Sequence, residues 1–375
     1  MYFNLLASFS QVMAYIGYIL LAILVLLVMV TIHELGHYIA GKIFKFGIEE
    51  FSIGFGPKLF SKKKKDGEVF SVRLIPLGGY CAFRGEDEAS DDEKAFNNKK
   101  PWQRIIVLIS GALMNYLLAL ILIVLMFACF GQTTLMVGKT QQSDNPEYSA
   151  EYSFLERDVF IKADGRNVYL LTDLMKATDN KKQGDLVEFD VLRDGEIRTI
   201  TVRLRRDTNY KNVEDATALY DALGVYYEVD ADGNMQNGGM YTTFVKLGFF
   251  KMLGRSFDYS FRLAGTVFTV LGQLLTGSIG IGSLGGTVTT VGLTAAAIQI
   301  GGIRYLLNIA ALIGVNLAVF NLLPIPSLDG SRVIFTVIEW IRKKPINRKV
   351  EAIIHTVGFV LILLFAVFID LQQCF

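Results

Sequence analysis

Residues 14–37 read AYIGYILLAILVLLVMVTIHELGH and decide the fold. The first 19 of them carry no charge, and a helix needs about 20 apolar residues to cross the hydrocarbon core of a bilayer. The alternative is a cleaved signal peptide. However, no Lys or Arg precedes Lys42, so the basic segment that begins such peptides is missing. We therefore expect a retained membrane-spanning helix that leads directly into the polar segment 33–37.

Three more uncharged runs follow, at residues 105–130, 305–323 and 352–369. The segment between the first and second runs is rich in Lys and Arg, and so is the segment between the third and fourth. Such segments mark cytoplasmic loops. Four spans then place both termini and the long segment 131–300 on the opposite side of the membrane.

The first part of that long segment, residues 134–206, has the pattern of a soluble domain. Apolar and polar residues alternate on both sides of Asp194-Gly195, which is typical of a β-hairpin. A second turn is expected at Asp164-Gly165 and a short helix at residues 170–178. These signals predict a small α+β domain on the outer face.

The remainder of the long segment is less regular. Residues 207–262 are predicted to be a linker with a surface helix near Phe244–Phe261. Residues 263–302 are apolar but rich in Gly and Thr, and a fifth span here would move the basic segment 342–349 to the wrong side. We expect this stretch to be interfacial or re-entrant. The predicted fold class is a polytopic α-helical membrane protein with four transmembrane helices and one inserted domain.

The composition of the 375-residue chain agrees with this class. Hydrophobic residues make up 52% and charged residues 19%, whereas soluble domains have about 25% charged residues. These values argue against a disordered chain and against an ordinary soluble enzyme. The net charge of +1 gives no sign of a nucleic-acid partner, and the three scattered cysteines suggest no disulfide framework.

The segment His33–His37 is an H-E-x-x-H motif. Residues i and i+4 of a helix face the same way, so the two imidazoles can bind one Zn²⁺, and the adjacent Glu34 can accept a proton from water at the metal. The alternative is a polar helix end at the level of the lipid headgroups. Two of the three histidines of the chain lie here, at the end of a membrane span where such residues are costly. We therefore predict a zinc site with His33 and His37 as ligands and Glu34 as the catalytic group.

A catalytic zinc site needs a third protein ligand and one open position. His355 is one candidate, although it has an ordinary helical neighbourhood and is equally explained as an interfacial histidine. Asp329 is the better candidate, because Pro324 and Pro326 end the helix before it and Gly330 permits a tight turn; a plain Asp-Gly turn is its alternative. The first and third spans both run toward the cytoplasm in the predicted topology, which places Asp329 at the depth of the two histidines. His355 shares this depth, so depth alone does not exclude it.

These motifs together resemble a known family. HELGH at the end of a first span, with NLLPIPSLDG at residues 321–330 after a later one, resembles the site-2 protease family of intramembrane zinc metalloproteases. The order of spans and insert resembles its bacterial branch, the regulator-of-sigma-E (RseP-like) proteases. Further matching pieces are residues 55–57, PLGGY at 76–80 and GALMN at 111–115.

The resemblance implies roles for particular residues. His33, His37 and Asp329 would bind zinc and Glu34 would be the catalytic base. Asn321 and Asn115 would orient the substrate or support the transition state. The insert would be a PDZ-like domain, and residues 46–84 would form a membrane-associated β loop that presents substrate as an added strand.

Three departures from the family pattern stand out. Ala112 replaces a Pro in the second span, and Gly286-Thr287 stands where Gly-Pro usually precedes the third span. Residues 156–158 read Glu-Arg-Asp where a PDZ domain usually has Gly-Asp. The last departure bears on peptide binding by the insert and leaves its fold untouched.

Cleavage of a transmembrane helix also requires an exposed strand edge. The substrate helix must unwind before its peptide bonds can be attacked, and a strand edge offers replacement hydrogen bonds. Residues 51–55 and 70–74 alternate and are predicted to supply that edge, with a plain surface hairpin as the alternative.

The predicted domains are the first transmembrane helix with the HExxH motif (1–45), the cytoplasmic-side β loop and basic loop (46–103), the second transmembrane helix (104–131), the extracytoplasmic PDZ-like domain (132–206), the linker, surface helix and interfacial segment (207–302), the third transmembrane helix with the LDG motif (303–330), the basic cytoplasmic loop (331–350) and the fourth transmembrane helix with the tail (351–375).

The predicted function is intramembrane zinc-dependent proteolysis in the cell membrane, with the active site toward the cytoplasm. The resemblance implies transmembrane substrates such as anti-sigma factors or signal-peptide remnants. A membrane transporter and a non-enzymatic scaffold with a PDZ-like domain are the alternatives. A transporter does not need an H-E-x-x-H motif with a distant Asp, and a scaffold needs no metal.

Overall fold

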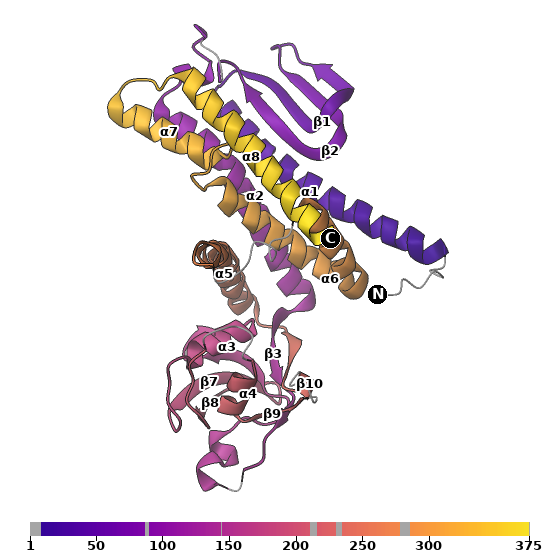
Figure 1. Ribbon diagram of the computed structural model, residues 1–375, viewed down its shortest axis with the longest axis vertical. Coiled ribbons are helices and arrows are strands. Elements are labelled where there is room, and N and C mark those ends of the chain that lie inside the picture. Colours follow the sequence, from indigo (N-terminus) through magenta and orange to yellow (C-terminus); the bar gives the residue numbers. More distant parts are fainter. Residues whose placement is uncertain are drawn as a thin grey trace. The chain divides into compact units, whose positions relative to one another are not determined.

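The computed structural model describes residues 9–86, 90–143, 145–210, 216–229, 235–277 and 286–374 (Figure 1). The chain forms two compact units. One consists of Met1–Leu125 with Ser260–Phe375, and the other is Met126–Tyr259. The first unit contains the apolar helices and the second is the insert.

Within the described residues, four helices are long and apolar enough to cross a membrane, as predicted. They are α1 (Phe9–Ile43), α2 (Pro101–Phe130), α6 (Thr287–Asn321) and α8 (Arg348–Cys374). Long uncharged runs form helices here because a helix satisfies all of its backbone hydrogen bonds internally. The third span was expected to begin at residue 303. Instead, α6 begins at Thr287 and is interrupted at Gly302, whose φ of 60° and ψ of −147° are open to glycine but not helical.

Small residues allow these helices to approach closely. Gly36 on α1 lies against the backbone of α2, where a Cβ atom at Gly36 would be 2.9 Å from Cα of Gly111. Gly314 on α6 faces Ala119 of α2 and Met29 of α1. Glycine at such crossings removes the side chain that would separate the backbones. The three helices α1, α2 and α6 therefore converge on one another.

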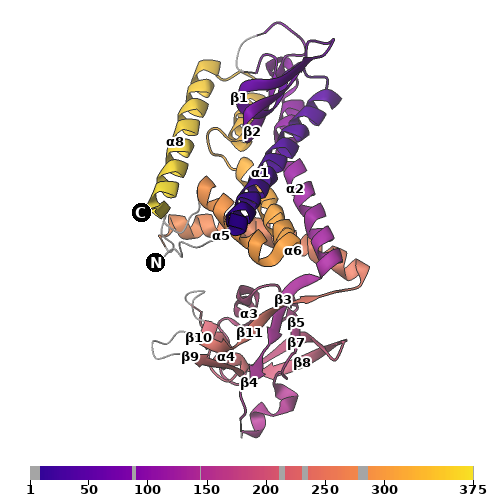
Figure 2. The same cartoon turned by 90° about the vertical axis from the view of Figure 1, so that its right-hand side faces the viewer.

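A curved β-sheet lies along the second half of α1 (Figure 2). It is formed by β1 (Ile48–Lys63) and β2 (Val69–Phe83), and each of these long strands contributes two segments. Residues 50–53 pair with residues 79–82 on one side and with residues 69–72 on the other, while residues 58–63 pair with residues 69–73. The order of segments across the sheet is therefore 79–83, 48–53, 69–73 and 58–63.

This order corrects the prediction of the edge. Residues 51–55 and 70–74 were expected to supply an exposed edge, but residues 51–53 and 70–72 within them have a paired neighbour on each side and are central. Alternation did not identify the edge, because apolar and polar residues alternate in a central strand just as they do in an edge strand. In the described part of the chain, the register pairs residues 79–83 with β1 alone, so this segment is one edge of the sheet.

The turn between β1 and β2 is attached to the end of α1. The Glu68 carboxylate is almost completely buried and accepts hydrogen bonds from Lys42 of α1 and from Lys64. Lys64 also donates to the hydroxyl of Tyr38 on α1, at 3.0 Å. The turn is thus held to the same helix that carries the H-E-x-x-H motif.

A short helical segment precedes α2, and a further helix links α6 to α8. The 3-10 helix η1 (Phe96–Asn98) precedes α2, and α7 (Asp329–Arg342) lies between α6 and α8. A buried ion pair links α7 to α2, since Arg104 donates to Glu339 at 2.7 Å and both side chains are at most 7% exposed. Breaking such a pair leaves an uncompensated buried charge, so α7 is held firmly.

The insert is a mixed α+β domain. Its main sheet has the order β11-β3-β5-β7-β8, with β6 paired to β5, and a smaller sheet has the order β10-β9-β4. The elements are β3 (Gln132–Val137), β4 (Lys139–Thr140), η2 (Pro146–Tyr148), η3 (Ala150–Tyr152), β5 (Val159–Ala163), β6 (Arg166–Asn167), α3 (Leu171–Thr178), β7 (Leu186–Arg193), β8 (Glu196–Arg203), α4 (Ala216–Leu223), β9 (Val225–Val229), β10 (Met235–Gly238) and β11 (Met240–Val245). The turns at Asp164-Gly165 and Asp194-Gly195, with positive φ at all four residues, and the helix α3 confirm the prediction for this region.

The domain extends beyond its predicted end at residue 206. Residues from 216 onward were expected to be a linker, yet Leu219, Leu223 and Val225 are completely or almost completely buried in the core of the insert. Strand β11 pairs with β3 along its whole length. The linker prediction was wrong because these residues become buried only through pairing with strands far away in the sequence.

The predicted surface helix also has different bounds. Phe244 belongs to β11, and the helix α5 runs from Phe249 to Leu275. It therefore continues beyond the predicted end at Phe261 and into the stretch that was expected to be interfacial. Several of its large apolar side chains are exposed, among them Phe250 at 86% and Phe261 at 66%.

Candidate metal centre

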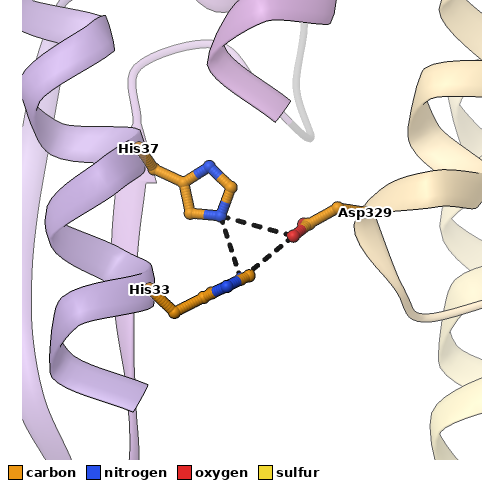
Figure 3. A group of neighbouring side chains, drawn as sticks. All are labelled: His33, His37 and Asp329. Atoms are coloured by element: carbon orange, nitrogen blue, oxygen red, sulfur yellow. Dashed lines mark hydrogen bonds and ion pairs between the residues drawn. The ribbon is translucent and has the colours of Figure 1, made fainter. Parts of the chain in front are cut away.

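Helix α1 brings the two histidines of the H-E-x-x-H motif together. His33 and His37 lie one turn apart, and both are buried. Their Nε2 atoms are 3.2 Å apart. Asp329 at the start of α7 places Oδ2 at 3.0 Å from Nε2 of His33 and at 3.3 Å from Nε2 of His37 (Figure 3). Three donor atoms therefore converge on one point from two segments that are 296 residues apart.

The loop after α6 explains how Asp329 reaches the histidines. The helix ends at Asn321, and the segment with Pro324 and Pro326 cannot continue it. The backbone turns sharply enough that a Cβ atom at Gly330 would collide with the backbone of Leu322 and Leu323. Only glycine allows α7 to begin so close to the end of α6. Gly330 is therefore required by this turn.

The donor set fits a zinc ion. The three ligand atoms lie within 4.8 Å of one another, and two imidazoles with one carboxylate leave the open position that a hydrolytic zinc site requires. His37 Nδ1 lies 2.8 Å from the carbonyl oxygen of Val107 on α2. A proton on Nδ1 donates to this carbonyl and leaves Nε2 free as a ligand, which is the usual arrangement around a metal-binding histidine.

His33 needs a similar partner at its Nδ1 atom. The amide groups of Asn115 on α2 and Asn321 on α6 both lie 3.4 Å from this nitrogen. Oδ1 of Asn115 is buried and, among the described residues, has no hydrogen-bond partner. Because the two ends of an amide are assigned from the hydrogen-bond network, turning this amide by 180° places its oxygen against Nδ1. Asn115 then accepts the proton that orients His33.

Space for the metal is left by a glycine. A Cβ atom at Gly111 on α2 would lie 2.8 Å from Cε1 of His33 and 2.7 Å from Cε1 of His37. Any side chain larger than hydrogen would therefore displace the two imidazoles. The sequence analysis did not assign this role to Gly111. Its position as the first residue of the GALMN motif was the feature that could have indicated it.

The edge strand of the β-sheet lies beside Glu34. A Cβ atom at Gly79 would be 3.5 Å from Cγ of Glu34. Burial raises the pKa of the Cys81 thiol, so it stays protonated and is not the thiolate that binds metals. Sequence reasoning missed the contact with Gly79, although PLGGY contains it.

His355 is not part of the His33, His37 and Asp329 group that the described residues form. Its Nδ1 accepts a hydrogen bond from the backbone N–H of Ser327, at 3.0 Å. The choice of Asp329 over His355 therefore agrees with the geometry. The ordinary helical neighbourhood of His355 gave no sign of this bond, because the donor belongs to a loop far away in the sequence.

Comparison with known proteins connects this geometry to an activity. The sequence profile described as Peptidase family M50 matches residues 21–365. A protein of Clostridium perfringens named as a zinc metalloprotease is 31% identical over 95% of this chain and 98% of its own length. Proteins with the same kind of name from Fusobacterium nucleatum and Mesorhizobium japonicum are 30% and 28% identical over 94% and 96% of this chain.

The family profile and these relatives span almost all of the chain, including both halves of the metal centre. Zinc is accordingly the expected cofactor. The lipid bilayer is the expected environment of the protein, and membrane proteins are its expected substrates. The chain belongs to peptidase family M50, the site-2 proteases, and is a membrane-bound zinc metalloprotease.

Proposed function

We propose that this protease cleaves peptide bonds within or beside transmembrane segments, with His33, His37 and Asp329 as zinc ligands and Glu34 as the general base. The observation that carries the proposal is the convergence of the three donor atoms of His33, His37 and Asp329, with Glu34 next to His33 in the chain. Further support comes from the partners of the histidines. Both Nδ1 atoms face groups on α2 that fix the rings with Nε2 toward Asp329.

Each residue has a distinct task. When bound, zinc supplies the Lewis acid that activates a water molecule and polarises the scissile carbonyl. Glu34 accepts the proton of the attacking water and delivers it to the amine that leaves, so one carboxylate serves both proton transfers. The Asn321 amide lies at the same centre and is suited to donate a hydrogen bond to the oxygen that becomes negatively charged.

The β-sheet is suited to hold the unwound substrate. A transmembrane helix has its peptide groups bonded internally and must open before it can be cleaved. An extended segment that pairs with the edge at residues 79–83 replaces those lost hydrogen bonds and passes directly beside Glu34. This edge takes the role that sequence reasoning had given to residues 51–55 and 70–74.

We further propose that the protein acts in regulated intramembrane proteolysis, as in the regulator-of-sigma-E branch. Anti-sigma factors and signal-peptide remnants are the proposed substrate classes. The insert is proposed to be an extracytoplasmic PDZ-like domain, and the metal centre to face the cytoplasm. The basic segments between α1 and α2 and between α6 and α8 support this orientation.

The test is zinc content and cleavage of a model transmembrane peptide by the purified full-length protein. We expect about one zinc per wild-type chain, and loss of both zinc and cleavage in His33→Ala and Asp329→Ala, since each removes one of three ligands. Asp194→Ala, in the exposed turn of the insert, is the control and should keep both. Normal zinc content and turnover in Asp329→Ala would refute the ligand set.

A further inference from the structure

Helix α8 contacts the loop that carries Asp329 at two points about one helical turn apart. Nδ1 of His355 accepts a hydrogen bond from the backbone N–H of Ser327, at 3.0 Å. Gly358 lies against Pro326, where a Cβ atom on Gly358 would be 2.5 Å from Cβ and 2.9 Å from the carbonyl carbon of the proline. The helix therefore touches two consecutive loop residues, and the second of them is two positions before Asp329.

The backbone of this loop needs external support. Ser327 has a φ of 83°, in the left-handed region that residues other than glycine seldom adopt. Such a conformation persists only where surrounding contacts hold it. A backbone N–H at such a position also needs an acceptor, and the His355 imidazole supplies one. The contact from α8 thus holds the loop in its unusual conformation.

The His355 ring also touches the helix that Asp329 begins. It packs edge-on against Phe335 of α7, with the ring centroids 5.7 Å apart and the planes at 72°. One side chain of α8 therefore contacts both the loop before Asp329 and the helix after it. A shift of this imidazole would therefore disturb both segments that hold Asp329, the loop before it and the helix after it.

The opposite end of α8 is attached to the start of α6. The Asp370 carboxylate accepts hydrogen bonds from the backbone N–H groups of Val288 at 3.3 Å and Thr289 at 3.4 Å, in the first turn of α6. A carboxylate at a helix N-terminus satisfies donors that have no partner within the helix. Helix α8 therefore contacts both the beginning of α6 and the loop that follows its end.

We propose that α8 is a positioning helix for the metal centre, in which His355 and Gly358 hold the loop so that Asp329 reaches the two histidines. This inference rests on the proposed role of Asp329 as a zinc ligand. His355 is a positioning residue, because it acts through Ser327 and touches neither the ligand group nor Glu34. The fourth span thus contributes to metal affinity as well as to membrane anchoring.

The test compares four variants of the full-length protein. His355→Leu removes the acceptor at similar size. His355→Asn keeps an acceptor oxygen near the position of Nδ1. Gly358→Ala disturbs the second contact without touching the first. Val357→Ala, whose side chain is 53% exposed on the same helix, is the matched control. The readouts are the zinc Kd from chelator competition, kcat and KM for a model transmembrane peptide, and thermal unfolding.

We expect His355→Leu and Gly358→Ala to weaken zinc binding about 10-fold or more, as is usual when the support of a metal ligand is lost, and to lower kcat with little change in KM. His355→Asn should restore zinc binding to within about 3-fold of wild type, and Val357→Ala should match wild type. Wild-type zinc affinity in both His355→Leu and Gly358→Ala would overturn the proposal, and so would equal losses in His355→Leu and His355→Asn.

The Asp329→Ala variant, measured in the same experiment, tests the zinc-ligand set separately from the positioning role of α8. If it keeps its zinc, the proposed ligand set fails. If it loses zinc while His355→Leu and Gly358→Ala do not, the ligand set stands and only the positioning role of α8 fails.

Discussion

Replacing Gly111 by Ala should disable the metal centre without changing any ligand. The new Cβ atom would lie 2.3 Å from Nε2 of His37, the atom proposed to bind zinc, whereas ordinary van der Waals contact begins at 3.4 Å, so this ring has to move by about 1.1 Å. Ligand distances in zinc sites are satisfied only within about 0.2 Å. We therefore expect zinc affinity to fall about 10- to 100-fold and peptide cleavage to fall with it.

The substitution should leave the fold intact, which makes the result specific. Alanine is more favourable than glycine within a helix by about 1 kcal/mol, so α2 itself is not weakened. The measurements are the zinc Kd by chelator competition, cleavage of a transmembrane peptide and the thermal unfolding midpoint. Gly17→Ala on α1 is the matched control, because a Cβ atom there meets nothing within 4 Å. Wild-type zinc affinity in Gly111→Ala, with Gly17→Ala also unchanged, would refute the geometry.

Three further predictions test other parts of the structure. Glu34→Gln should abolish cleavage and keep bound zinc, because the amide cannot accept the proton while the ligands remain; measurable turnover at the wild-type rate would exclude Glu34 as the base. Leu219→Ala should destabilise the insert by about 2–5 kcal/mol, since the side chain is fully buried in its core; an unchanged unfolding transition would instead support the linker assignment of residues 207–262. In intact cells, a cysteine at Asp194 should react with a membrane-impermeant thiol reagent and one at Lys64 should not, with the parent protein as the background; the reverse pattern would contradict the proposed orientation.

Much of the metal centre was predictable because its signals are local. Uncharged runs indicate spans, and histidines four residues apart lie on one face of a helix wherever that helix sits. Asp329 was predictable for a related reason, since two prolines and a glycine around a carboxylate describe a rigid turn at a helix end. None of these inferences required knowledge of distant contacts.

The parts that were missed depend on contacts between distant segments. Residues 240–245 join the insert through the pairing of β11 with β3, more than 100 positions earlier in the chain. The edge of the β-sheet is residues 79–83 only because β1 and β2 fold back and pair twice. The support from His355 is a bond between a side chain and a backbone N–H in another element, which leaves no periodic trace in the sequence.

The attachment of the β-sheet to α1 fixes the distance between the edge of the sheet and Glu34. The sheet meets α1 at Glu34, Tyr38 and Lys42, which are spaced by four residues along one face of the helix. The edge at residues 79–83 therefore keeps a constant distance from the Glu34 carboxylate. A paired substrate strand can slip along this edge only in steps of two residues, or about 7 Å, because a slip of one residue turns every side chain to the opposite face. If substrates pair with this edge as proposed, cleavage sites would be selected by their distance from the point where strand pairing begins, and alternative cuts in one substrate would fall two residues apart.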